Sequence, residues 1–208
     1  MGRFAIPLRK YLLADTGTTI KFLILSDVVL ISAKGLLGPV FAIFIEDYIV
    51  GANAMVIGAA ATIFLLTKSL LQIPFAHIMD KIKGERDDFL MMVIGTFISA
   101  VVPLAFLFIH TPFQLYFVEF LLGIGAAMAF PSFMAIFTRH IGKEREGVEW
   151  GIYFTLVDFG SALTAAIGGM LALTLGFPIL IIGLTVIGLI GTFLLFPIKK
   201  RLRMPEKV

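Results

Sequence analysis

The chain has 208 residues, of which 59% are hydrophobic and only 15% charged, with a formal net charge of +3 and a mean hydropathy of +1.02. Soluble domains are about 45–50% apolar and about 25% charged, so this composition excludes an ordinary soluble globular domain. There is no cysteine and only three scattered histidines, which excludes disulfides and thiolate sites and leads us to expect no metal and no cofactor.

Six apolar stretches are each long enough to cross a bilayer as a helix, which takes about 20 residues. They cover residues 20–44, 55–78, 89–109, 113–137, 150–173 and 177–198. Their apolar residues run continuously rather than alternating, which favours helices over barrel strands. The sequence therefore predicts an all-α integral membrane protein with one six-helix domain over residues 20–198.

The segments on either side of this domain are short and basic. Residues 1–19 form an N-terminal segment, in which apolar residues at roughly helical spacing over 3–13 are compatible with an interfacial amphipathic helix or with a frayed end. Residues 199–208 form a basic tail. We expect both segments to lie in the cytoplasm, because cytoplasmic segments of membrane proteins are enriched in Lys and Arg.

The basic residues follow that rule along the whole chain. Of the 17 Lys and Arg, 15 lie in the N-terminal segment, at its junction with the first span, in the loops after spans two and four, or in the tail. The three other loops have none. This asymmetry predicts a multi-pass protein of the cytoplasmic (inner) membrane with both termini cytoplasmic, and it explains the pI of about 9.2 without a nucleic-acid partner.

Five ionisable residues fall inside the predicted spans: Asp27, Lys34, Lys68, Glu119 and Asp158. A charge at the middle of a bilayer costs roughly 2.5–3.5 kcal/mol on insertion scales, so such residues are candidates for a substrate or proton site. The alternative is a set of buried ion pairs that only fix helix packing, for example Lys34 with Asp158. Spans three and six carry no such residue, and we expect them to face lipid.

Helix breakers occur in the same spans. Gly38 and Pro39 stand together in the first span, and Pro131 lies near the end of the fourth. Proline removes a backbone hydrogen bond and kinks a helix. We interpret these residues as points of bending between two states, with close packing of small residues as the alternative.

The loop after span two resembles a signature of the major facilitator superfamily, Gly-x-x-x-Asp-Arg/Lys-x-Gly-Arg/Lys-Arg/Lys, at the same place in the topology. Asp80 and Lys81 match it, while Ala76 stands at the first glycine, Gly84 comes one residue late and Glu85 replaces a basic residue. The resemblance implies a cytoplasmic gate, which we assign to Asp80, Lys81, Gly84 and Arg86.

Span five resembles a glycine frame of some antiporters of that superfamily, Gly-x8-Gly-x3-Gly-Pro-x2-Gly-Gly. The matching residues are Gly151, Gly160, Gly168 and Gly169. Thr164 and Ala165 stand where the family has Gly-Pro, which argues against drug/proton antiport. The resemblance implies a closely packed fifth helix.

Members of this superfamily usually have two parallel six-span halves, each built from nested three-plus-three inverted repeats. The chain corresponds to one half. The resemblance therefore implies a secondary transporter, not an enzyme, which moves a small solute by alternating access, with protons as a candidate coupling ion. A lone six-span half would leave Asp27, Lys34 and Asp158 exposed to lipid, so we expect a second copy to cover them in a homodimer with two-fold symmetry. No Gly-x4-Gly-Lys-Ser/Thr sequence for ATP is present. The alternatives are a membrane assembly or scaffold protein, a channel, or a half that pairs with a different six-span chain.

Overall fold

The computed structural model describes residues 13, 16–81, 84–142 and 144–202. All regular elements in these ranges are helices. In chain order they are α2 (Thr18–Leu37), η1 (Gly38–Val40), α3 (Phe41–Tyr48), α4 (Ala54–Lys81), α5 (Arg86–Val101), η2 (Val102–Leu107), α6 (Pro112–His140), α7 (Glu146–Leu175), α8 (Phe177–Phe193) and η3 (Phe196–Arg201). The predicted interfacial helix lies outside these residues except for its last position, and so does the tail beyond residue 202.

The prediction of six membrane-spanning helices is confirmed. Six helical segments are long and apolar enough to cross a membrane, and each overlaps one predicted span. The first is interrupted where the break was expected, because Gly38 and Pro39 begin a short 3-10 segment between α2 and α3. The fourth membrane-spanning helix, α6, is not interrupted and continues through Pro131.

The predicted helix ends were wrong by several residues. Glu46 and Asp47 were expected in a loop, but no helix breaker separates them from Phe41, where α3 begins, and they lie in the last turn of α3. Likewise α5 begins at Arg86 and α7 at Glu146, so both helices include charged residues that were expected in loops. Asp or Glu in a first turn is favoured by the helix dipole, which explains how these helices extend beyond their apolar part.

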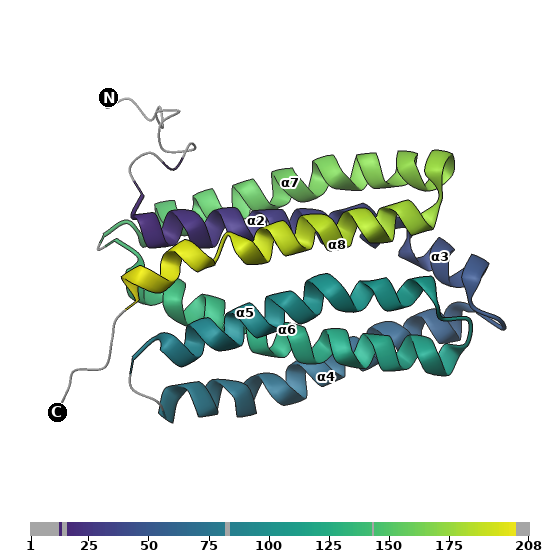
Figure 1. Cartoon of the computed structure of the whole chain (residues 1–208), viewed down its shortest axis with the longest axis horizontal. Coiled ribbons are helices and arrows are strands. Elements are labelled where there is room, and N and C mark those ends of the chain that lie inside the picture. Colours follow the sequence, from purple (N-terminus) through teal and green to yellow (C-terminus); the bar gives the residue numbers. More distant parts are fainter. Residues whose placement is uncertain (1–12, 14–15, 82–83, 143, 203–208) are drawn as a thin grey trace.

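The helices form two layers of three (Figure 1). One layer holds α2, α7 and α8, and the other holds α4, α5 and α6. Within the first layer α2 packs on both α7 and α8; within the second, α6 packs on both α4 and α5; and α5 joins α8 across the layers. These contacts stay the same when spans one, two and three are exchanged with spans four, five and six, as nested repeats require. The repeats themselves stay a prediction.

Close packing of α2 on α7 depends on glycines. A Cβ atom at Gly160 would collide with Ser32, and one at Gly168 would collide with the backbone of Leu36. The expectation of a closely packed fifth helix therefore holds at these two positions. At Gly151 and Gly169 a Cβ would meet nothing within 4 Å, so these two glycines lie on a different face of α7.

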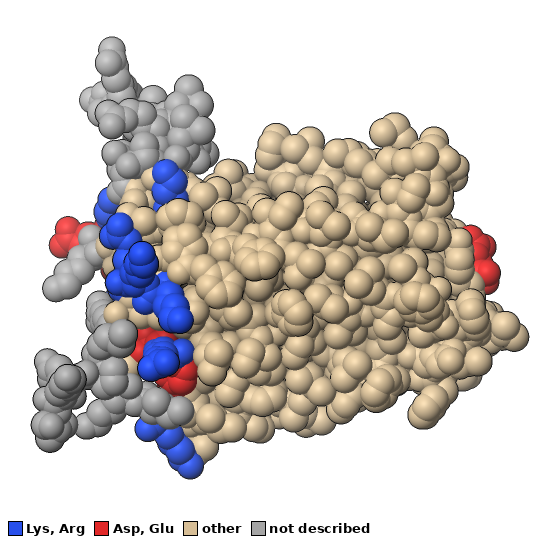
Figure 2. Space-filling view, in the orientation of Figure 1, with Lys and Arg blue, Asp and Glu red and all other residues tan. Residues whose placement is uncertain are grey.

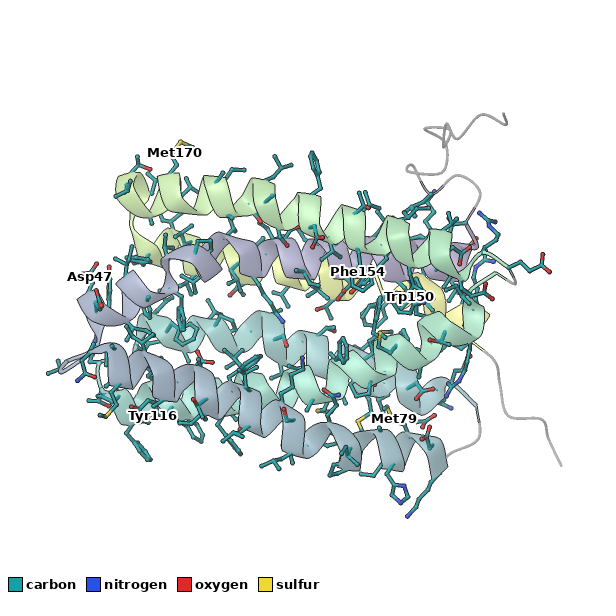
Figure 3. All side chains as sticks on the ribbon, turned by 180° about the vertical axis from the view of Figure 1, so that it is seen from behind. Asp47, Met79, Tyr116, Trp150, Phe154 and Met170 are labelled. Atoms are coloured by element: carbon teal, nitrogen blue, oxygen red, sulfur yellow. The ribbon has the colours of Figure 1, made fainter. Side chains whose placement is uncertain are left out.

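Lys and Arg are seen at one end of the bundle, whereas Asp and Glu are seen at both ends (Figure 2). Lys and Arg gather at the end where α2 begins, α4 meets α5 and α6 meets α7, which we call the basic end. Asp47 lies at the opposite end (Figure 3). On the face drawn in Figure 2 the surface between the ends shows neither blue nor red, and the exposed large residues of α5 and α8 between the ends are hydrophobic. This surface suits lipid, and the lipid exposure of spans three and six stays a prediction.

Candidate functional site

A cavity of about 280 Å³ lies between the two layers, in contact with α2, α4, α5, α6 and α7. Three of the five predicted site residues line it, namely Asp27, Lys34 and Lys68. Asp27 and Lys34 are seven residues apart on α2, two helical turns, so they share a face of that helix. The geometry therefore brings together residues from two different spans whose charges the sequence had singled out.

Asp27 is held by α7. The Tyr153 hydroxyl donates a hydrogen bond of 2.6 Å to Asp27 Oδ2, and both residues line the cavity. Tyr153 is positioned by ring contacts with Phe133 and Phe137 of α6, with centroid distances of 5.3 and 5.7 Å. The carboxylate is thus fixed at the junction of α2, α6 and α7.

Lys34 lines the cavity from α2. Its side chain is exposed although it stands near the middle of the first membrane-spanning segment. It also lines a second cavity of about 190 Å³, which extends to Glu119 on α6. Glu119 is only 6% exposed. Each of the two cavities is thus lined by one carboxylate, and Lys34 lines both.

Lys68 enters the cavity from α4. Its ammonium group lies 4.8 Å from the centroid of the Phe130 ring, within the range of a cation–π contact. Phe130 belongs to α6, the helix on which α4 packs most extensively. This contact replaces part of the hydration that the ammonium group loses inside a membrane.

Asp158 lies elsewhere. It is exposed on α7 and is not among the residues that line these two cavities. In the described part of the chain no ion pair joins Asp158 to Lys34. The Lys34–Asp158 pair, offered above as an example of a buried ion pair that fixes helix packing, does not form within a single copy. A carboxylate exposed at this depth requires another explanation, which we take up below.

The predicted gate residues are at the basic end. Asp80 and Lys81 form the exposed end of α4, Gly84 follows in the connection with φ of 109°, and Arg86 begins α5. The positive φ explains why a glycine is needed at this point of the connection. These residues are placed where the gate was expected, and their role stays a prediction.

A cluster of charged side chains beside the gate was not predicted. Asp88 of α5 forms an ion pair with Arg139 of α6, and His140 Nε2 lies 3.6 Å from Glu85 Oε2. Glu149 of α7 accepts a 3.2 Å hydrogen bond from the Gly142 amide. Three carboxylates in the cluster, those of Glu85, Asp88 and Glu149, are at most 2% exposed.

This cluster joins the segments that meet at the basic end, because two of its contacts link the end of α6 to the start of α5 and to the connection before it, and the third links the α6–α7 connection to α7. Tyr153 and Phe130 were also missed. A tyrosine in an apolar span was the one available signal, since a buried hydroxyl usually has a hydrogen-bond partner.

The chain was compared with known proteins. The family model described as Major Facilitator Superfamily matches residues 23–207. Among solved structures, one described as "In meso crystal structure of the POT family transporter PepTSo" is similar with a TM-score of 0.71 and 14% sequence identity.

That match covers 91% of this chain and 39% of the transporter, so the chain spans less than half of the transporter's length. At this identity the likeness concerns the fold alone. A comparison with curated proteins gives no match. The family model covers most of the chain, and the six helices reproduce one half of the fold of such a transporter. The chain belongs to the Major Facilitator Superfamily, a family of membrane transporters.

Proposed function

We propose that the chain is a half-sized secondary transporter of the cytoplasmic membrane, which works as a homodimer and moves a small solute by alternating access. The basic end lies in the cytoplasm, as the distribution of Lys and Arg favours. The cavity with Asp27, Lys34 and Lys68 is the solute site, and Asp27 is the candidate proton carrier because it is the carboxylate that lines the larger cavity.

The observation that carries this proposal is the exposure of Lys34 in the middle of a membrane-spanning segment. A cation facing lipid at this depth costs roughly 2.5–3.5 kcal/mol or more. A second six-helix unit against this face would cover Lys34 and convert the cavity into a central site. A homodimer with two-fold symmetry is the commonest way to supply such a unit.

The exposed surface of α7 supports a protein partner. Large apolar residues such as Leu163, Ile167 and Met170 occupy one side of the helix, and Met170 points away from the bundle (Figure 3). A neighbouring face has small or polar residues at spacings of three, four or seven, which are Gly151, Thr155, Asp158, Ala162 and Gly169. Small residues let helix backbones approach closely in membranes, so we assign this face to a neighbouring helix and the large residues to lipid.

The exposed surface of α4 is divided in the same way. Leu66, Leu70 and Ile73 form its large apolar side. The face beside it is mostly small or polar, with Gly58, Thr62, Ser69, Gln72 and Ala76, and it has one large apolar residue, Leu65; a Cβ at Gly58 would meet nothing within 4 Å. The two faces are therefore similar in composition on two helices that run in opposite directions across the bundle.

These two faces match in register when α4 of one copy lies against α7 of the other. We place Lys81 at the end of α4 and Glu146 at the start of α7 at one depth; residues equally far from them then stand at equal depth, since both helices rise 1.5 Å per residue. The pairs at equal depth are Asp80 with Gly147, Ala76 with Gly151, Gln72 with Thr155, Ser69 with Asp158, and Gly58 with Gly169. In this register the exposed carboxylate of Asp158 meets the hydroxyl of Ser69, which can donate a hydrogen bond to it.

Cross-linking tests the dimer, because the chain has no cysteine of its own. Two differently tagged copies, one with Ala76→Cys and one with Gly151→Cys, are expected to form a disulfide in the membrane. A second mixture with Gly58→Cys and Gly169→Cys tests the other end of the same faces.

The matched control mixes Leu66→Cys with Leu163→Cys, both exposed on the large apolar sides and only two residues from equal depth, and we expect no cross-link between them. If the tagged copies neither cross-link nor purify together, the homodimer is wrong and the second unit is a different chain.

Reconstitution in liposomes tests transport. A secondary transporter gives saturable uptake of a labelled solute and accelerated exchange when unlabelled solute is inside, and a proton-coupled one concentrates the solute when a pH gradient is imposed. A channel would give unsaturable flux without exchange. A scaffold protein would give no flux above protein-free liposomes, and this result would reject the proposal.

A further inference from the structure

The cavity has more cationic than anionic side chains. Lys34 and Lys68 both line it, whereas Asp27 is the single carboxylate in its lining. Neither lysine forms an ion pair within the described residues, and Asp27 accepts its hydrogen bond from Tyr153 rather than from a lysine. Lys34 lies within electrostatic reach of both Asp27 and Lys68. Two ammonium groups thus stand in one membrane-embedded cavity without a carboxylate in contact.

We infer that the solute is a small organic anion whose carboxylate lies between Lys34 and Lys68. This inference rests on the proposed function, because it concerns the same cavity. A charge inside the membrane-spanning part of a protein is retained when it is paired or when it serves a function. An anionic ligand supplies the missing pairing, and charge-assisted hydrogen bonds from ammonium groups to a carboxylate are among the strong ones in proteins.

The remaining lining suits the rest of such a solute. Phe64, Phe130 and Phe133 give an apolar wall for a hydrocarbon part. The Ser99 hydroxyl lines both cavities and has no hydrogen bond within the described residues, so it can donate to or accept from a second polar group. A two-fold homodimer would present the lysine pair twice, so the excess of positive charge increases in the complete site.

Binding of acids and their amides tests the inference with the full-length protein. The probes are straight-chain mono- and dicarboxylates from acetate to adipate, each compared with its uncharged amide, and the readout is thermal unfolding of the purified protein in detergent. At least one acid is expected to raise the unfolding temperature in a saturable way, while its amide leaves it unchanged. If no acid of the series binds, or if acid and amide bind equally, the inference is wrong.

Substitutions locate the binding site. Lys34→Gln and Lys68→Gln are each expected to weaken binding of the acid about tenfold to a hundredfold, because each removes a hydrogen bond to a charged group. Lys34→Arg is expected to restore part of the affinity. Lys21→Gln is the matched control, since Lys21 is an exposed lysine of the same helix α2 at the basic end. Unchanged affinity in Lys34→Gln, or an equal loss in Lys21→Gln, would overturn the assignment.

Transport measurements separate this inference from the proposed function. An acid that binds through Lys34 and Lys68 but is not taken up by liposomes rejects the transporter and leaves the anion site standing. Saturable uptake of a neutral or cationic solute, with no competition from any acid of the series, leaves the transporter standing and rejects the anion site.

Discussion

The Tyr153 hydroxyl donates a 2.6 Å hydrogen bond to Asp27 Oδ2 and so joins α7 to α2 at the wall of the larger cavity. A hydrogen bond to a charged group contributes about 1.5–3 kcal/mol to stability. The same bond fixes the carboxylate on the cavity side of α2. Any movement of α7 relative to α2 must therefore break this bond or carry Asp27 along.

Tyr153→Phe removes this bond and keeps the ring contacts with α6. We expect a lower unfolding temperature, with a loss of about 1.5–3 kcal/mol if Asp27 is ionised. Tyr116→Phe is the control, since Tyr116 is a half-buried tyrosine of α6 with no hydroxyl hydrogen bond among the described residues. Equal unfolding temperatures for the two variants would mean that the bond does not stabilise the protein.

Asp27→Asn keeps the size of the side chain and removes its ability to carry a proton. We expect the variant to exchange labelled for unlabelled solute but to lose accumulation driven by a pH gradient. Both are measured in the same proteoliposomes. Asp47→Asn, at an exposed position of α3, should behave as the unmodified protein. If Asp27→Asn still concentrates the solute, another group carries the proton or the transport is not proton-coupled.

Arg139→Met leaves Asp88, which is 1% exposed, without its ion-pair partner. Removing one member of a buried pair costs about 3–5 kcal/mol, and we expect the lower end because the Arg139 side chain is 35% exposed. Adding Asp88→Asn to this variant should recover more than half of the loss. Unfolding temperatures of the single and double variants measure the coupling, and losses that simply add would reject it.

Gly168→Ala and Gly169→Ala are the same substitution at neighbouring positions with different surroundings. A Cβ at Gly168 collides with the Leu36 carbonyl, so we expect a loss of at least 1–3 kcal/mol or failure to fold. A Cβ at Gly169 meets nothing within 4 Å in one copy, so the unfolding temperature of the Gly169→Ala variant should not change. Gly169→Leu should fold but associate less well with a second copy. Equal stability of the two alanine variants would contradict the close packing of α2 on α7.

Asp80→Asn tests the gate. In the register proposed above, Asp80 of one copy faces Gly147 in the first turn of the other copy's α7, where a carboxylate is favoured by about 0.3–1 kcal/mol, up to about 2 when partly buried. When Asp80→Asn is added to both tagged copies, we expect less cross-linking between the Ala76→Cys and Gly151→Cys copies. Cross-linking between the Gly58→Cys and Gly169→Cys copies, at the opposite end, should increase.

The control is Glu46→Gln, an exposed acidic residue at the other end of the bundle. Unchanged cross-linking at both ends in Asp80→Asn would show that Asp80 does not contribute to closure. A loss at both ends would indicate a weaker dimer rather than a shifted gate.

Much of the fold could be predicted because the length of an apolar run is a property of the sequence alone. The six spans and the break at Gly38 follow from such local signals. The ends could not be predicted as well, since the helices continue beyond the apolar part wherever charged side chains are satisfied. Asp88 illustrates this, because its partner Arg139 comes from a distant segment and their ion pair satisfies a buried carboxylate in the first turn of α5.

The site was predicted in part, because charge and depth can be read from a sequence but the rotation of a helix cannot. Asp27, Lys34 and Lys68 meet in one cavity. Asp158 does not, because Gly160 and Gly168 turn their side of α7 toward α2 and leave Asp158 on the outside. The glycine frame in span five contains two glycines that pack on α2, Gly160 and Gly168, and two that do not, Gly151 and Gly169. Only the packing of the helices distinguishes these two kinds of glycine.

The start of α2 and the end of η3 both lie at the basic end of the bundle (Figure 1). Two copies could therefore be expressed as one tandem polypeptide through a flexible linker that never crosses the bilayer. Such a fusion removes the symmetry between the copies, so Lys34 or Asp27 can be replaced in one half while the other half keeps it. It would tell whether a single lysine pair or a single proton carrier is enough for a complete transport cycle.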